Sequence, residues 1–274
     1  MKRIATIQDI SCLGKCSLTV ALPILSAMGM ETAILPTAVF STHTLFSRFT
    51  RTDLTEALPG IIEHWKEEKF AFDAIYSGYL GTPRLIGITA DLFRRFRNDH
   101  SLMVVDPVMA DNGKLYPGFT EDYARQMTEL CAVADVIVPN MTEASLMLGV
   151  PYRESGYDEA YIRLLLRKLT DLGARTAVLT GVSFEEGRIG AMAYCAEDDT
   201  FTAYFNDRVD AMYHGTGDIF ASTLVGSLVR GDGMEKALQL AADYTRESIR
   251  LTKEDPNGVS YGVNFEQVMG MLTR

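Results

Sequence analysis

Short apolar runs alternate with amphipathic helical stretches along most of this chain. Residues 74–77 and 102–105 are typical of buried strands, and the stretches after them, 83–98 and 119–133, carry apolar residues at helical spacing. Two strands joined by a helix normally lie parallel in one sheet, because the helix carries the chain back to the edge where the first strand began. The alternation therefore predicts an α/β fold, a three-layer αβα sandwich with a mostly parallel central sheet.

The other predicted elements continue this pattern until the last third of the chain. Further strands are expected over residues 3–8, 32–38, 136–138 and 176–180. Further helices are expected over 17–28, 53–69, 142–148, 158–172, 217–230 and 234–251. Two strands, 189–195 and 200–205, flank the polar turn Glu197-Asp198-Asp199 and predict an antiparallel hairpin. Asp53 is the expected N-cap of its helix, and Pro59 is expected to kink that helix.

Composition narrows the class of protein. With 274 residues and 47% apolar side chains, residues 1–274 are expected to form a single large domain. The formal net charge of −10 does not suit nucleic acid, and no apolar run is long enough to span a membrane. No secretory signal is visible, and four cysteines are too few for a disulfide scaffold of this size. We therefore expect a cytoplasmic protein with no nucleic acid or membrane partner.

Polar motifs gather where the predicted strands end. They are Gln8-Asp9, Ser41-Thr42-His43-Thr44, Ser77-Gly78-Tyr79, residues 106–111, residues 140–143 and Thr180-Gly181. Ligands of parallel sheets bind outside the carboxyl ends of the strands, so we expect these motifs to share one site. His43 and Tyr79 are typical of contacts to a planar heteroaromatic ligand, through hydrogen bonding and stacking, although His43 alone fits an ordinary loop histidine better.

The motif His214-Gly215-Thr216-Gly217-Asp218 leads into an apolar helix. A glycine-rich turn at a helix N-terminus presents free backbone N–H groups and the positive end of the helix dipole, so it attracts anions. A carboxylate at the same place can accept the proton of a substrate hydroxyl. The motif therefore indicates phosphoryl transfer to an alcohol, with Asp218 as the general base. A loop with Asp218 as an N-cap explains the same letters.

Two carboxylates, Asp106 and Asp111, follow a predicted strand, and Asn140 and Glu143 follow the next one. Hard cations such as Mg²⁺ prefer oxygen ligands and complete their coordination with water and nucleotide phosphates. These residues could therefore face a metal or a phosphate. A proline turn at Asp106 and a capping box of Asn140 with Glu143 are the structural alternatives, and both interpretations can hold for the same residues.

Taken in order, these motifs resemble the pyridoxal/pyridoxamine kinases of the ribokinase-like superfamily. The matching pieces run through almost the whole chain: Ile7-Gln8, Phe40-Ser41-Thr42-His43-Thr44, Ser77-Gly78-Tyr79-Leu80-Gly81, Asp106-Pro107-Val108-Met109, Pro139-Asn140 with Glu143, Val209-Asp210-Ala211, and Gly215-Thr216-Gly217-Asp218. The resemblance implies a ribokinase-like fold and ATP-dependent phosphorylation of the 5′-hydroxymethyl group of a B6 vitamer (pyridoxal, pyridoxamine or pyridoxine). It also implies Mg²⁺, a monovalent cation such as K⁺, and a homodimer.

The resemblance assigns roles residue by residue. It implies that Asp218 accepts the hydroxyl proton. It also implies that the backbone N–H groups of Gly215, Thr216 and Gly217 stabilise the charge of the transferred phosphoryl group. The residues implied on the magnesium-ATP side are Asp106, Asp111 and Glu143, with Asn140 nearby and with Thr180 and Val209 bordering the nucleotide. The residues implied around the pyridine ring are His43, Thr44 and Tyr79.

One departure from the family lies at Asp9, where these kinases commonly have serine after Ile-Gln. A carboxylate in the substrate pocket would favour the cationic amine of pyridoxamine over the aldehyde of pyridoxal. Two alternatives remain beside this function. A hydroxymethylpyrimidine kinase of the same superfamily also fits His214-Gly215-Thr216-Gly217, but it often has cysteine in place of Asp218. A vitamin-binding protein without catalysis fits the fold but not the intact Asp106 and Asp218.

Overall fold

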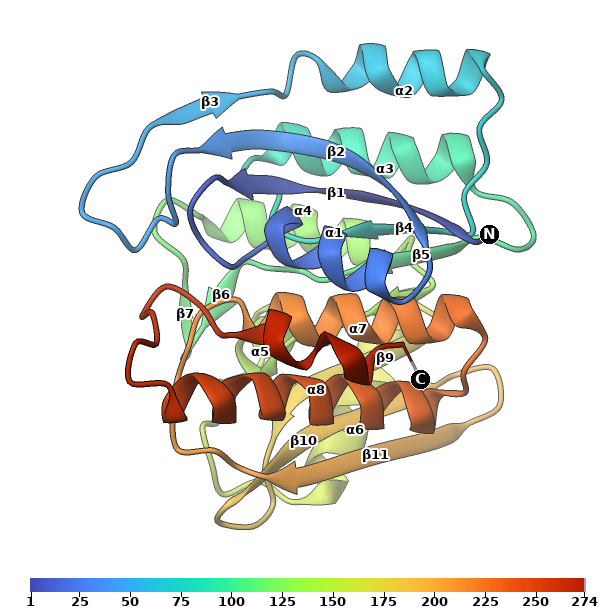
Figure 1. The fold of residues 1–274 in the computed structure, drawn as a ribbon. Coiled ribbons are helices and arrows are strands. Elements are labelled where there is room, and N and C mark those ends of the chain that lie inside the picture. Colours follow the sequence, from blue (N-terminus) through green and yellow to red (C-terminus); the bar gives the residue numbers. More distant parts are fainter. Residues whose placement is uncertain (274) are drawn as a thin grey trace.

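One sheet of nine strands forms the centre of the computed structural model, which describes residues 1–273 (Figure 1). The strands are β1 (Arg3–Ser11), β2 (Glu31–Phe40), β3 (Arg51–Asp53), β4 (Ala74–Ser77), β5 (Leu102–Val105), β8 (Val136–Ile137), β9 (Thr176–Val182), β10 (Arg188–Cys195) and β11 (Thr200–Asp207). They lie in the order β11-β10-β9-β8-β5-β4-β1-β2-β3. The six strands from β9 to β2 pair in parallel. At the two edges, β3 and the hairpin of β10 and β11 pair antiparallel.

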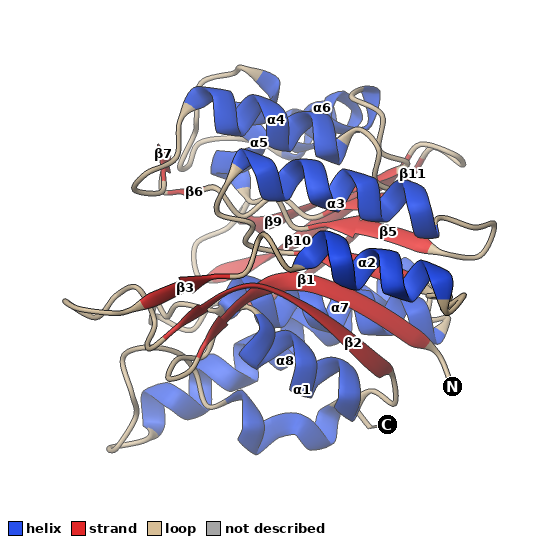
Figure 2. Ribbon diagram, turned by 90° about the horizontal axis from the view of Figure 1, so that it is seen from above, coloured by secondary structure: helices blue, strands red, loops and turns tan. Residues whose placement is uncertain are grey.

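Helices cover both faces of this sheet (Figure 2). One face carries α2 (Leu58–Glu67), α3 (Pro83–Phe96), α4 (Glu121–Cys131), α5 (Met141–Leu148) and α6 (Glu159–Asp171). The other carries α1 (Leu18–Ala27), α7 (Thr216–Arg230) and α8 (Met234–Glu254), with the 3₁₀ helix η1 (Phe265–Met271) packed against α8. Successive strand residues serve opposite faces: Ile75 packs in the first core and Tyr76 in the second, and both are fully buried. The predicted three-layer αβα sandwich is confirmed.

Most predicted elements lie within a few residues of their expected bounds, and the predicted hairpin is β10 with β11. The stretch 53–69 is the exception. Asp53 ends β3, and its Oδ1 accepts the backbone N–H of Thr55 at 2.9 Å instead of capping a helix. Helix α2 begins only at Leu58, so Pro59 lies in the first turn, where the helix needs no N–H from it. The predictions of an Asp53 cap and a Pro59 kink were therefore wrong.

The parallel strands bring their following loops to one edge of the sheet. Two interstrand hydrogen bonds show this directly: the N–H of Cys12, after β1, donates to Phe40 O at 2.8 Å, and the N–H of Asp106, after β5, donates to Ser77 O at 2.9 Å. A small hairpin of β6 (Ala110–Asp111) and β7 (Lys114–Leu115) also follows β5. Within residues 1–273, no helix combines the length and the apolar character needed to cross a membrane.

Candidate active site

The glycine-rich motif forms the start of α7. Gly215 is the residue before the helix and has φ +79°, in the left-handed region that favours glycine. A Cβ atom at this position would lie 1.9 Å from the carbonyl oxygen of Lys15, so the close approach of the two loops also requires glycine. The first backbone N–H groups of α7, from Thr216 to Asp218, have no acceptor within the helix. The turn therefore offers donors and a positive dipole end to an anion.

Asp218 lies in the first turn of α7 and is half-buried. Burial raises the pKa of its carboxyl group to about 7, and the negative charge of Asp9 raises it further, whereas a hydrogen bond from the backbone N–H of Ser17 lowers it. Ser17 holds φ +50°, which is uncommon for a residue with a side chain. A carboxylate with a pKa near neutrality is suited to general-base catalysis at physiological pH.

Asp9 lies next to this carboxylate, at an irregularity in the pairing of β1 with β2 between Gln8 and Ile10. Its side chain is buried. Burial raises the pKa of Asp9 to about 6, and the Ser17 hydroxyl and the charge of Arg51 oppose that rise. Burial and the charge of Asp9 also raise the pKa of Tyr79. The structure thus brings Asp9, Tyr79 and Asp218, which are far apart in the sequence, into one neighbourhood.

Aromatic rings line the same edge of the sheet. The His43 ring lies 5.3 Å from the ring of His214, the residue before Gly215, so the loop after β2 reaches the glycine-rich turn. Burial and the nearby His214 lower the pKa of His43. The Tyr79 ring lies 5.6 Å from the Phe119 ring, which is stacked on a further aromatic ring. Thr44 is exposed in the loop after His43.

Asn140 and Glu143 form the capping box that their spacing predicts. Asn140 Oδ1 accepts the N–H of Glu143 at 2.9 Å, and Glu143 Oε2 accepts the N–H of Asn140 at 2.9 Å. Glu143 Oε1 also accepts the N–H of Met109 at 3.0 Å, and Asn140 Nδ2 donates to Ala110 O at 2.9 Å. The pair therefore fixes the loop after β5 as well as the start of α5.

Asp106 lies in that loop, and its carboxyl group is buried close to Glu143. Burial, followed by the negative charges of Glu143 and Asp218, holds the pKa of Asp106 well above its usual range. Burial also raises the pKa of Glu143 to about 8, although backbone N–H groups oppose that rise. Two buried carboxyl groups that disfavour each other's charge fit a site that a cation neutralises.

Asp111, the third predicted metal ligand, is exposed on the small hairpin, where its Oδ1 accepts the N–H of Asn112 at 2.8 Å. Across the described residues 1–273, no group of three or more His, Cys, Asp or Glu side chains is arranged to hold a metal ion. Asp106, Asp111 and Glu143 thus do not form a complete metal site by themselves. The donor set fits Mg²⁺ that takes its other ligands from water and nucleotide phosphates.

The two remaining predicted nucleotide contacts lie in different loops. Thr180 lies in β9, paired with Asn140 through an isolated β-bridge, and the next residue, Gly181, has φ +73°. Val209 lies between β11 and α7, where its carbonyl oxygen accepts the N–H of Ala211 at 2.8 Å. The structure therefore places Thr180 next to the capping box and Val209 in the segment that leads to the glycine-rich turn.

Three residues near Asp9 and Asp218 were not predicted from the sequence as part of the site: Cys16, Ser17 and Arg51. Burial raises the pKa of the Cys16 thiol, and the charges of Asp218 and Asp9 raise it further, so this cysteine is a protonated neighbour of both carboxyl groups. Ser17 and Arg51 act on Asp9. Nothing in the sequence marks the unusual φ of Ser17, and Arg51 falls in a strand that was not predicted.

Comparison with known proteins identifies the family of this chain. Residues 25–264 match the model of the phosphomethylpyrimidine kinase family. A pyridoxal kinase of Rubrobacter xylanophilus is 30% identical over 233 residues, which cover 80% of this chain and 76% of that protein. A crystal structure of a Bacteroides thetaiotaomicron protein, named provisionally as a phosphomethylpyrimidine kinase, is 40% identical with a TM-score of 0.96. The match covers 100% of this chain and 94% of the Bacteroides chain.

A second crystal form of the Bacteroides protein contains pyridoxal; it gives a TM-score of 0.94, with coverage of 100% and 96%. The pyridoxal kinase of Lactobacillus plantarum is 31% identical with a TM-score of 0.89, and the match covers 99% of this chain and 96% of that one. Both the family model and these relatives span most of the chain. The chain therefore belongs to the ribokinase-like phosphomethylpyrimidine kinase family, together with the pyridoxal kinases that it resembles.

Proposed function

We propose that this protein is an ATP-dependent kinase that phosphorylates the 5′-hydroxymethyl group of a B6 vitamer. The observation that carries the proposal is the position of Asp218, with its pKa near 7, in the first turn of α7 beside backbone N–H groups without helical acceptors. An alcohol needs a base at its proton and positive charge around the phosphoryl group that it receives, and this turn supplies both. The 40% identical Bacteroides protein, crystallised with pyridoxal, supports the choice of vitamer.

The mechanism assigns one task to each part of the site. Asp218 accepts the proton of the substrate hydroxyl while the hydroxyl oxygen attacks the terminal phosphorus of ATP. ADP leaves with the electron pair of the broken bond. The N–H groups of Gly215, Thr216 and Gly217 stabilise the charge on the transferred phosphoryl oxygens. Asp106 and Glu143 would hold Mg²⁺, with Asp111, Asn140, Thr180 and Val209 toward the nucleotide. When bound, the metal neutralises phosphate charge.

The remaining candidates surround the vitamer. Tyr79 and His43 would contact the pyridine ring, with Thr44 at the loop edge. Asp9 would lie under the substituent that differs between vitamers, because it is buried next to Asp218, the base that meets the reacting hydroxyl. ATP consumption with pyridoxal, together with identification of pyridoxal 5′-phosphate by mass spectrometry, tests the function. Consumption of ATP without that product would refute it.

Replacing Asp9 with serine is expected to lower the preference for pyridoxamine over pyridoxine. A carboxylate that pairs with the cationic amine contributes about 1.5–3 kcal/mol, so the ratio of the two kcat/KM values should fall by about 10- to 150-fold. The measurement is steady-state kinetics of Asp9→Ser with both vitamers. Asp171→Ser, in an exposed aspartate at the end of α6, is the control and should keep the wild-type ratio. An unchanged ratio in Asp9→Ser would rule out amine recognition by Asp9.

The pH dependence of the reaction should reveal the coupling between the two aspartates. Asp218 acts as a base only when it is deprotonated, so kcat/KM with pyridoxine should rise as the pH increases through about 7. The charge of Asp9 raises the pKa of Asp218, so Asp9→Asn should move this rise to lower pH. The measurement is the pH profile of kcat/KM for the wild type and for Asp9→Asn, both with pyridoxine, whose 4-substituent carries no charge. Coincident acid limbs would show that the aspartates are not coupled.

The second candidate function is a hydroxymethylpyrimidine kinase, because the matched family is that of the phosphomethylpyrimidine kinases. In this chain either reaction would use Asp218 and the same turn, so substrate preference separates the two functions. A binding protein without catalysis is separated by ATP consumption. A homodimer, a cytoplasmic location, a monovalent cation such as K⁺ and a single domain over residues 1–274 stay predictions.

A further inference from the structure

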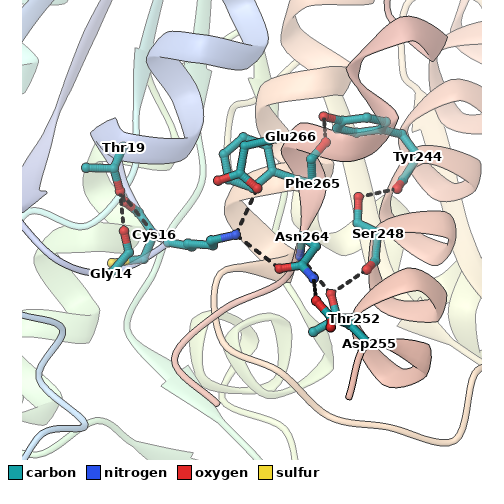
Figure 3. A network of polar contacts seen from close by, with 11 residues as sticks. Gly14, Cys16, Thr19, Tyr244, Ser248, Thr252, Asp255, Asn264, Phe265 and Glu266 are labelled. Carbon is teal, nitrogen blue, oxygen red and sulfur yellow. Dashed lines mark hydrogen bonds and ion pairs between the residues drawn. The ribbon is translucent and has the colours of Figure 1, made fainter. Parts of the chain in front are cut away.

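A lysine in the loop between β1 and α1 is held by the last part of the chain. Lys15 Nζ lies 2.8 Å from Glu266 Oε2 and donates to Asn264 Oδ1 at 3.3 Å. It also lies 5.7 Å from the centre of the Phe265 ring. Figure 3 shows Asn264 and Glu266 facing the group formed by Gly14 and Cys16 of this loop and Thr19 of α1. We call Asn264 and Glu266 the C-terminal clamp.

The clamp is itself fixed to α8. The N–H of Asn264 donates to Thr252 Oγ1 at 2.7 Å, and Asn264 Nδ2 donates to Asp255 Oδ2 at 2.9 Å. The carbonyl oxygen of the intervening Phe265 accepts the hydroxyl of Tyr244 at 2.8 Å (Figure 3). Tyr244 is fully buried. Lys15 is therefore tied to α8 through Asn264, which bonds to Thr252 within that helix and to Asp255 at its end.

Two glycines leave room for Lys15, one at its carbonyl oxygen and one at its side chain. A Cβ atom at Gly215 would lie 1.9 Å from the Lys15 carbonyl oxygen, and a Cβ atom at Gly262 would lie 2.4 Å from the Lys15 Cβ atom. The lysine thus fills the space between the glycine-rich turn and the C-terminal segment. A shift of the Lys15 backbone toward the turn should displace it, because the space between Gly215 and the Lys15 carbonyl oxygen cannot hold even a Cβ atom.

The same loop contacts the proposed base. Ser17, two residues after Lys15, lies beside the Asp218 carboxyl group, and its backbone N–H lowers the pKa of that group. Thr19 Oγ1 ties the loop to α1 through contacts to the carbonyl oxygens of Gly14 at 3.0 Å and Cys16 at 2.8 Å. A short rigid path therefore leads from the clamp through Lys15 to both the phosphate-binding turn and Asp218.

We propose that Lys15 is a positioning residue: held by the C-terminal clamp, it sets the position of the Gly215 turn and of the Asp218 carboxylate for phosphoryl transfer. This inference rests on the proposed function of Asp218. An ion pair at the surface adds little stability, about 0–1 kcal/mol. Displacement of a reacting group by about 1 Å can cost 10²-fold in rate. The effect of the clamp should therefore appear in kcat rather than in stability.

Lys15→Met removes the ammonium group and keeps most of the side-chain volume. We expect kcat to fall by about 10- to 100-fold, with KM for ATP and for the vitamer within about twofold of wild type. Lys2→Met is the matched control. Lys2 Nζ lies 2.8 Å from Asp73 Oδ1, the same distance as in the Lys15–Glu266 pair, but Lys2 is not part of the loop between β1 and α1. Glu266→Gln should lower kcat less, and adding it to Lys15→Met should cause little further loss, because both remove one interaction.

A pair of glycine variants tests the same path without changing charge. Gly262→Ala should push Lys15 and lower kcat, whereas Gly270→Ala, whose Cβ atom meets nothing within 4 Å, should not. Equal kcat values for Gly262→Ala and Gly270→Ala would contradict the proposal, as would a Lys15→Met enzyme with wild-type kcat.

Amide hydrogen exchange gives a readout that does not depend on activity. In Lys15→Met, the backbone N–H groups of residues 12–17 and 214–219 should exchange faster than in wild type, and those in Lys2→Met should not. Unchanged exchange in these segments would overturn the inference. If wild type consumes no ATP with any vitamer, the proposed function fails, while exchange still decides whether Lys15 holds the turn. If Lys15→Met does not fold, Glu266→Gln and Gly262→Ala decide the matter in its place.

Discussion

Asp218→Ala is expected to lower kcat by about 10²- to 10⁴-fold while the vitamer and ATP still bind. The substitution removes the only group proposed to accept the hydroxyl proton and leaves the backbone of the α7 turn in place. Binding should be measured by calorimetry and turnover by a coupled ATP assay. Asp171→Ala, in an exposed aspartate at the end of α6, should keep full activity.

Stability separates a lost base from a lost fold. The pKa of Asp218 is raised from 3.8 to about 7, so its ionisation disfavours the folded state as the pH rises through that range. Asp218→Asn removes this cost and should melt no lower than wild type at pH values above about 7. The N-cap of α7 is Gly215 rather than Asp218, so a stable Asp218→Asn protein with wild-type kcat would show that Asp218 has only a structural role in the first turn of the helix.

Gly215→Ala is expected to destabilise the protein and to lower kcat by about 10²- to 10³-fold, as the loss of an oxyanion donor does in other enzymes. The new Cβ atom would lie 1.9 Å from the Lys15 carbonyl oxygen, and alanine disfavours the φ of +79°. The turn must therefore open, and its N–H groups lose their common direction. Thermal unfolding and kinetics of the same sample give both effects.

Gly29→Ala is the matched control for the backbone conformation. Gly29 has φ +86°, but a Cβ atom there meets nothing within 4 Å. Gly29→Ala should lower the free energy of unfolding by about 1–2 kcal/mol, because alanine disfavours the left-handed backbone conformation, and it should leave kcat unchanged. If Gly215→Ala behaves like Gly29→Ala in both measurements, the contact with Lys15 has no role in shaping the turn.

The fold could be predicted because burial leaves a strong signal. Strands such as Ala74–Ser77 and Leu102–Val105 are buried on both faces and appear as short apolar runs with the predicted bounds. The error at Asp53 has a local cause, since an aspartate that accepts an N–H two residues on resembles an N-cap in sequence. The hairpin of β6 and β7 and the short strand β3 give little signal, because each spans only two or three residues.

The site could be predicted only in part. The capping box of Asn140 and Glu143 follows from local spacing, and the structure confirms it. The coupling of Asp9 with Asp218, which raises the pKa of Asp218, could not be predicted in this way. The two residues lie 209 positions apart in the sequence, and only the complete fold brings them together. Lys15 was missed for the same reason: its partner Glu266 lies 251 residues further along the chain. Separation in sequence, rather than chemistry, limits such predictions.

Substrate preference of the wild-type protein tests the proposed function most directly. The ATP-dependent kcat/KM should be measured for pyridoxal, pyridoxamine, pyridoxine and hydroxymethylpyrimidine under one set of conditions, with the phosphorylated product identified for each. We predict that a B6 vitamer is phosphorylated on its 5′-hydroxymethyl group with at least about tenfold higher kcat/KM than hydroxymethylpyrimidine, a difference of about 1.4 kcal/mol at the transition state. Preference for hydroxymethylpyrimidine, or no ATP consumption with any of the four compounds, would contradict it.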